Sequence, residues 1–119
     1  DGRYIYMRCP EPNNGPLYEY TVMPTHIRSF FSIPELQTME LAEPFSFTKG
    51  CRTMRLEAYH WADPVPFGTL LFDLQSDPGQ EQPISDENVE AEMIEHLIRL
   101  MKANDAPPEQ YKRLGLANG

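Results

Sequence analysis

The stretch that decides the fold is residues 68–101, GTLLFDLQSDPGQEQPISDENVEAEMIEHLIRLM. Residues 69–74 form a short apolar run that is typical of a strand, and Asp77-Pro78-Gly79 follows as a turn. Proline presets φ at the second turn position, and glycine accepts a positive φ at the third, so the chain can reverse there without strain. We therefore expect this strand and the helix after it to be neighbours.

Residues from about 86 to 103 are expected to form one long amphipathic helix. Ser85 or Asp86 can accept a hydrogen bond from the first turn, and Pro107-Pro108 stops the helix at its other end. Its apolar residues recur at steps of three and four and form one stripe, Val89, Met93, Ile94, Leu97, Ile98, Leu100 and Met101. Such a stripe needs a sheet to cover. A short terminal helix is expected over residues 108–114, because proline favours a helix start and Gly115 a helix end.

Residues 1–75 are expected to form the sheet. Alternating β-type patterns occupy residues 3–8, 17–23 and 53–59, the first two as a possible antiparallel pair, and Pro34 marks a short helix start within 32–36. The 12 prolines exclude long helices from most of this part. The chain of 119 residues is thus expected to be one α+β domain, with a small antiparallel sheet of about four strands covered by one long C-terminal helix.

The charge and composition of the chain exclude some classes of binding partner. The net charge is −8, and residues 68–106 hold nine acids against Arg99 and Lys102, whereas residues 21–60 balance four acids with four bases. An acidic chain argues against nucleic acid or an anionic membrane as partner. We expect no membrane span, because no apolar run is long enough, and the first residues show no basic-then-apolar leader. Because a chain that starts like an excised piece need not show its leader, the compartment stays open between cytoplasm and periplasm. A start at Asp1 without an initiator Met suggests a piece of a larger protein.

Two stretches resemble the C-terminal subdomain of bacterial sulfatases, in the alkaline phosphatase superfamily. The opening Asp-Gly-Arg-Tyr-Ile-Tyr is one, and Leu-Phe-Asp-Leu-x-x-Asp-Pro-Gly-Gln-Glu, leading into the amphipathic helix, is the other. The match is most specific in residues 68–101 and weaker in 1–8. The resemblance implies an antiparallel sheet with a long helix, packed on the N-terminal catalytic domain of the same polypeptide, which hydrolyses a sulfate ester.

The same resemblance implies that the reactive chemistry lies elsewhere. The family's nucleophile is a formylglycine made from Cys or Ser in Cys/Ser-x-Pro-Ser-Arg, beside acids that hold a divalent cation, expected to be calcium. Cys51-Arg52-Thr53-Met54-Arg55 lacks the proline and the serine of that motif, and Ser32-Ile33-Pro34-Glu35-Leu36 lacks its arginine. No catalytic residue and no metal ligand are therefore expected in this chain, which is expected to be inactive alone.

Three residues are candidates for substrate binding at the rim of the parent's pocket. His26 could donate a hydrogen bond to a sulfate or a sugar hydroxyl, although an ordinary interface histidine fits the same pattern. Lys49 could stabilise charge on an anionic ester, and Gly50 lets the backbone approach closely, although a solvated surface lysine is the common alternative. His60, beside Trp61, suits stacking on a sugar or aryl ring, and a loop anchor explains the pair equally well.

Two other functions remain open from the sequence. A stand-alone module could hold a glycan with its aromatic residues, Tyr4, Tyr6, Tyr18, Tyr20 and Trp61. The C-terminal part of a related phosphodiesterase or phosphonate hydrolase is the other alternative, because this piece alone does not distinguish sulfur from phosphorus. An excised subdomain is also expected to self-associate, through the Phe30-Phe31 or the Phe45–Phe47 region.

Overall fold

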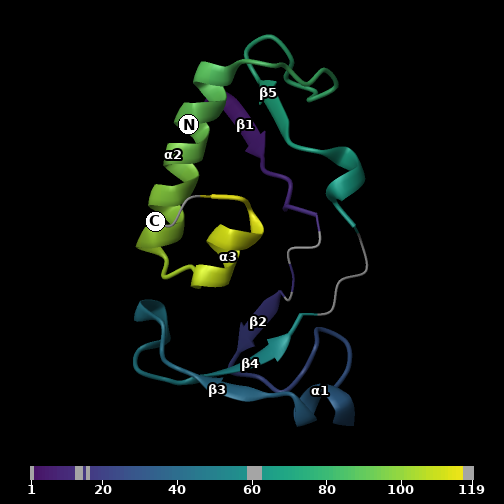
Figure 1. The fold of residues 1–119 in the computed structure, drawn as a ribbon, viewed down its shortest axis with the longest axis vertical. Helices are drawn as coiled ribbons and strands as arrows, with labels where there is room; N and C mark the ends of the chain where they lie inside the picture. Colours follow the sequence, from purple (N-terminus) through teal and green to yellow (C-terminus); the bar gives the residue numbers. More distant parts are fainter. Residues whose placement is uncertain (1, 13–14, 16, 59–62, 117–119) are drawn as a thin grey trace. The chain divides into compact units, whose positions relative to one another are not determined.

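The computed structural model describes residues 2–12, 15, 17–58 and 63–116. They form an α+β protein with two small antiparallel sheets (Figure 1). The chain divides into two compact units. One, here called the terminal unit, joins residues 1–14 to residues 62–119, and the other, the central unit, comprises residues 15–61.

The terminal unit is built on a two-stranded sheet of β1 (Tyr4–Met7) and β5 (Leu70–Asp73). Their register puts Tyr4 opposite Asp73 and Met7 opposite Leu70. The guanidinium of Arg3 donates to both carboxylate oxygens of Asp73, from Nε at 3.1 Å and from Nη2 at 2.7 Å. Because such a two-pronged ion pair fixes direction as well as distance, it locks the two strands in this register.

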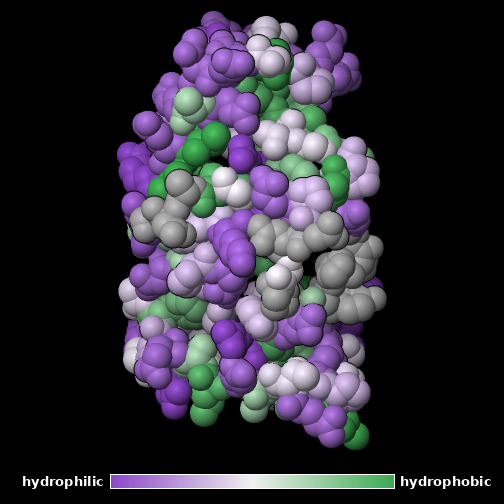
Figure 2. All heavy atoms as spheres, in the orientation of Figure 1, coloured by the Kyte–Doolittle hydropathy of each residue, from purple (hydrophilic) through white to green (hydrophobic). Residues whose placement is uncertain are grey.

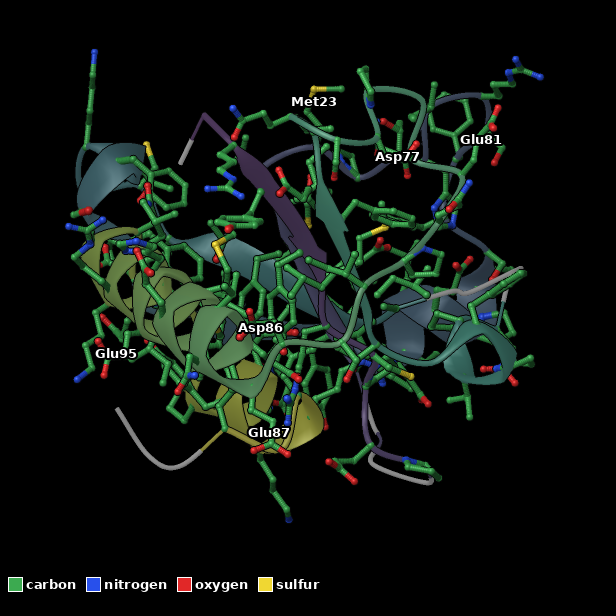
Figure 3. All side chains as sticks on the ribbon, turned by 90° about the horizontal axis from the view of Figure 1, so that it is seen from above. Met23, Asp77, Glu81, Asp86, Glu87 and Glu95 are labelled. Carbon is green, nitrogen blue, oxygen red and sulfur yellow. The ribbon has the colours of Figure 1, made fainter. Side chains whose placement is uncertain are left out.

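Helix α2 (Glu87–Ala103) follows β5 and packs on the β1 side of the sheet, where the Tyr6 hydroxyl donates to Glu90 at 2.9 Å (Figure 1). Asp86 starts the helix, because its carboxylate accepts from the amides of Asn88 and Val89 at 3.0 and 3.1 Å. Figure 3 shows Asp86 and Glu87 at this end of the helix and Glu95 pointing away from the sheet. No residue of the apolar stripe of α2 is fully buried, because six of them are partly exposed and Leu100 is 57% exposed.

The chain ends on α3 (Pro108–Arg113), which the segment after β1 holds in place. Arg8 donates from Nε to the Leu114 carbonyl at 3.0 Å, and the Glu11 amide donates to the Arg113 carbonyl at 2.8 Å. Gly115 has φ 61°, and a side chain there would collide with the Glu11 carboxylate, so glycine is required on both counts. The buried apolar side chains of the unit, in its described part, are Leu71, Phe72, Tyr111 and Leu116.

The central unit is a three-stranded antiparallel sheet in the order β2 (Tyr18–Thr21), β4 (Thr53–Glu57), β3 (Glu40–Ala42). Tyr20 and Glu40 both lie opposite Arg55, on either side of it. Before β3 comes α1 (Ile33–Gln37), and after it the 3-10 turn η1 (Ser46–Thr48). Leu56 is 1% exposed and Phe31 is buried, so these two side chains form the core of the described part of this unit.

Both expected C-terminal helices are present within a residue of their expected ends, but the expected single sheet of about four strands is wrong. Residues 3–8 do not pair with residues 17–23, because β1 pairs with β5 and β2 pairs with β4. Alternation identifies a strand without naming its partner. Here the Arg3–Asp73 ion pair joins β1 to β5 instead. No helix in the described ranges is both long and apolar enough to cross a membrane.

Candidate functional site

The most interconnected group of polar side chains in the described part of the central unit surrounds His26. Its Nε2 lies 2.7 Å from Oε1 of Glu35, at the start of α1, and its Nδ1 lies 3.9 Å from Oε1 of Glu19, on β2. The ring packs edge-on against the buried Phe31, with 4.6 Å between ring centroids. The imidazole therefore connects three parts of the unit: β2, the segment that follows it, and α1.

Glu35 is fixed by the capping box that begins α1. The backbone amide and the hydroxyl of Ser32 each donate to Glu35 Oε2 at 2.6 Å, and the Ser32 hydroxyl accepts from the Glu35 amide. These bonds, the Ser32 hydroxyl first and the contact with His26 last, lower the pKa of Glu35 to about 2. Glu35 is therefore a carboxylate at any physiological pH.

The surroundings of His26 suit a cation or a hydrogen-bond donor better than an anion. The carboxylates of Glu19 and Glu35 both face the imidazole, so an approaching sulfate would meet two negative charges beside the one ring. One ring nitrogen is already bonded to Glu35. A carboxylate bonded to imidazole fixes the tautomer and orients the ring, and this is the chemical capacity of the group.

Lys49 lies in a tight turn between η1 and β4. The Cys51 amide donates to the Thr48 carbonyl at 3.0 Å, and Lys49 and Gly50 have φ of 53° and 82°, so both central positions are left-handed. This is the pattern of a type I′ turn, in which lysine is uncommon. The Thr48 hydroxyl, 2.9 Å from the Phe45 carbonyl and 2.8 Å from the Cys51 carbonyl, braces the turn. Lys49 is exposed, and no ion pair to its ammonium group occurs in residues 17–58.

The two arginines near Lys49 are compensated by acids. Arg52 forms an ion pair with Glu43 at 3.2 Å, and Arg55 forms one with Glu40 across the sheet. The Glu40 carboxylate is the main reason why the pKa of Arg55 is raised. Lys49 is therefore better placed than Arg52 or Arg55 to attract an anion.

A run of aromatic side chains, here called the aromatic row, follows one face of the central sheet. The Arg55 guanidinium lies 4.5 Å from the Tyr18 ring centroid, and Tyr20 meets Phe45 edge-on at 5.1 Å. Phe45 in turn stacks on Phe47 at 5.3 Å with the planes 5° apart. Phe47 is 64% exposed. Tyr18 and Tyr20 were expected from the sequence as glycan contacts but the two phenylalanines were not, although Phe-x-Phe before the β4 pattern was an available signal.

The three candidate substrate-binding residues are not gathered into one site by the described structure. His26 contacts α1, which precedes β3, whereas Lys49 follows η1 at the other end of that strand (Figure 1). His60 and its neighbour Trp61 lie outside the described residues. Tyr4 and Tyr6 belong to the terminal unit, and the Tyr6 hydroxyl is used by Arg8 and Glu90.

Ligands for a metal ion are not grouped in the described ranges. Among these residues no three His, Cys, Asp or Glu side chains come together as a metal ion would require. Cys9 and Cys51 are free thiols, Cys9 with its Sγ 3.3 Å from the Pro10 carbonyl. No protein-family model, no curated protein and no solved structure matches the chain.

Proposed function

We propose that this chain is the C-terminal subdomain of a sulfatase, which completes the fold and the rim of the substrate pocket while sulfate-ester hydrolysis takes place on the N-terminal catalytic domain. The observation that carries the proposal is the Arg3–Asp73 ion pair, at 2.7 Å. The two stretches that resemble the family, 1–8 and 68–101, are 60 positions apart in the sequence, and this pair ties them into one sheet. If both stretches belong to one subdomain of that family, they should lie in the same structural unit, as they do here.

The incomplete cover of α2 supports the same proposal. None of the residues of its apolar stripe is fully buried, and Leu100 is 57% exposed. An amphipathic helix of 17 residues usually buries such a stripe against a partner layer. A catalytic domain of the same polypeptide is the partner that we propose.

The reactive groups belong to that other domain in this proposal. Cys51 is followed by Arg52 and Thr53, so the sequence needed for formylglycine is incomplete, and the described residues offer no group of ligands for a divalent cation. We therefore derive no catalytic step in this chain. Its contribution to the reaction is one exposed cation, Lys49, held in a braced turn where an anionic ester could meet it.

The role of Lys49 is tested in the full-length parent enzyme. Lys49→Ala is expected to raise KM for an aryl sulfate several-fold with little change in kcat, since the side chain binds the ester without taking part in bond cleavage. Lys102→Ala is the matched control, because Lys102 is an exposed lysine in the last turn of α2. Equal KM values for the two variants would show that Lys49 does not bind the substrate at the pocket rim.

The aromatic row favours a second function, a stand-alone module that binds a glycan. The exposed Phe47, stacked on Phe45, offers a sugar an apolar surface, and the Arg55–Glu40 pair on the same sheet offers hydrogen-bonding groups. Calorimetric titration of the isolated chain with neutral and sulfated oligosaccharides tests it. Saturable micromolar binding that Phe47→Ala abolishes would favour the module. Phe67→Ala is the control, because Phe67 is also highly exposed, at 73%, but lies in the terminal unit. If no sugar gives a heat of binding, the result favours the subdomain.

A further inference from the structure

The segment between β2 and α1 is held by a small number of identifiable contacts. Thr25 and Phe30 form an isolated β-bridge, and the Phe31 amide donates to the Pro24 carbonyl at 3.4 Å, so the segment closes on itself. Ile27 and Phe30, at its tip, are 102% and 82% exposed, so the described residues cover little of either side chain. Its attachment to the sheet therefore depends on Phe31 and His26.

His26 makes the polar part of that attachment. It reaches Glu35 of α1 with Nε2 and faces Glu19 of β2 with Nδ1, at 2.7 and 3.9 Å. Within residues 17–58 these two carboxylates are the charged groups that face the ring from the elements packed against it. Ser32 adds an uncharged hydroxyl to the cluster and is bonded to Glu35.

The two protonation states of an imidazole would bind these carboxylates differently. In the imidazolium both nitrogens carry a proton, so each can point an N–H at a carboxylate. In the neutral ring only one nitrogen carries a proton, and the contact with Glu35 would keep it on Nε2. The lone pair of Nδ1 would then face the Glu19 carboxylate, and the charge attraction to both acids would be gone.

We infer that His26, Glu19 and Glu35 form a proton-controlled latch, which holds residues 24–31 against α1 and β2 more tightly when the imidazole is charged. Histidine is the side chain that ordinarily gains and loses its charge between pH 5 and 8, so these two pH values are the ones to compare. Glu35 does not titrate there, because its pKa is about 2. Opening the latch would free the segment that carries Ile27 and Phe30.

Hydrogen exchange of the full-length chain, followed by NMR at pH 5 and pH 8, tests the inference. The amide of Phe31 reports the closed segment, and the amide of Leu36, which donates to the Ser32 carbonyl at 3.0 Å, reports α1. After correction for intrinsic exchange rates, their opening is expected to increase on the order of threefold from pH 5 to pH 8, the range for a partly exposed ion pair.

Variants separate the latch from other effects of pH. His26→Gln keeps a hydrogen-bond donor near Glu35 but cannot be charged, so it should abolish the pH response. His96→Gln should leave the response intact, because His96 is on α2 in the terminal unit, where it lies 3.4 Å from Glu92. Glu35→Gln should weaken the response, because the carboxylate at Nε2 is lost while Glu19 remains. Ser32 can still bond to the amide oxygen, so the start of α1 should be retained. A flat wild-type profile, or an undiminished response in His26→Gln, would overturn the latch.

Discussion

Single side chains determine which strands meet in this protein. Arg3 and Asp73 lie 70 positions apart, and Asp73 is 8% exposed. Its carboxylate also accepts from the Gln75 amide at 3.0 Å, so it fixes both the end of β5 and the turn after it. Arg3, the larger cause, and the Gln75 amide both lower the pKa of Asp73. One charged pair therefore links the first residues of the chain to the stretch that precedes the long helix.

Removing this pair should destabilise the terminal unit. Asp73→Asn and Arg3→Lys are each expected to lower the melting temperature by a few degrees, because the first loses the charge and the second loses the fork that binds two oxygens. Arg52→Ala is the control, since the side chain of its partner Glu43 is 85% exposed, whereas that of Asp73 is 12% exposed. Thermal unfolding checks this, and an effect of Arg52→Ala as large as that of Asp73→Asn would contradict the assigned role.

Glu35 gives the chain an acid-labile element. Its pKa falls from an ordinary value of 4.5 to about 2 on folding, so between these two values the unfolded chain binds more protons than the folded one. Its contribution to the free energy of unfolding is therefore complete above about pH 4.5 and is lost as the pH falls towards 2. Glu35→Gln should flatten this part of the pH profile of chemical denaturation. An unchanged slope between pH 4.5 and 2 in that variant would exclude Glu35 as its source.

At the scale of elements, the sequence predicts the helices better than the sheets, because a helix carries its own signals. The capping carboxylate of Asp86, the periodic stripe and Pro107-Pro108 all lie within or beside the helix that they define. A strand needs a partner, and the partners of β1 and β2 lie at least 32 positions away. Alternation could not choose between them, so the expected pairing of the first two strands failed.

The start of α2 can be tested by its cap. Asp86→Ala should reduce the free energy of unfolding by about 1 kcal/mol, because two amides of the first turn lose their acceptor. Asp86→Asn should retain most of the stability, since an amide oxygen can accept the same bonds. Urea denaturation measures both, and equal losses in the two variants would contradict a capping role.

The candidate site was less predictable than the helices. Lys49 could be chosen from its glycine neighbour, and the structure gives it a braced left-handed turn. The two acids beside His26 could not be predicted from the sequence. Glu19 lies on β2 and Glu35 in α1, and the orientation of Glu35 depends on its capping box. Tyr20 meets Phe45 although β2 and β3 are not neighbours in the sheet, where β4 lies between them, and their sequence spacing does not predict this contact.

At the scale of the whole molecule, charge and apolar surface are distributed unequally. The central unit carries five acids and four bases, and the remaining thirteen acids and six bases belong to the terminal unit. Hydrophobic side chains reach the surface among hydrophilic ones (Figure 2). Of the two regions expected to mediate self-association, Phe30 and Phe47 are exposed, whereas Phe31 is buried.

Self-association should therefore depend on the exposed phenylalanines. Phe30→Ser or Phe47→Ser is expected to shift the isolated chain towards monomer, and added salt should favour association by screening the net charge of −8. Phe67→Ser, in the terminal unit, serves as the control for loss of one exposed ring. Sedimentation velocity across a concentration series measures the effect. A wild-type chain that stays monomeric throughout would contradict self-association.

We propose that these residues form the non-catalytic C-terminal subdomain of a sulfatase. The most direct test is to sequence the coding region upstream of Asp1 in the gene that encodes the chain. If the claim holds, one continuous reading frame will encode Cys/Ser-x-Pro-Ser-Arg within several hundred codons, together with acids able to hold a divalent cation. An upstream frame without that motif, or an initiation codon directly before Asp1 that opens the frame, would contradict it.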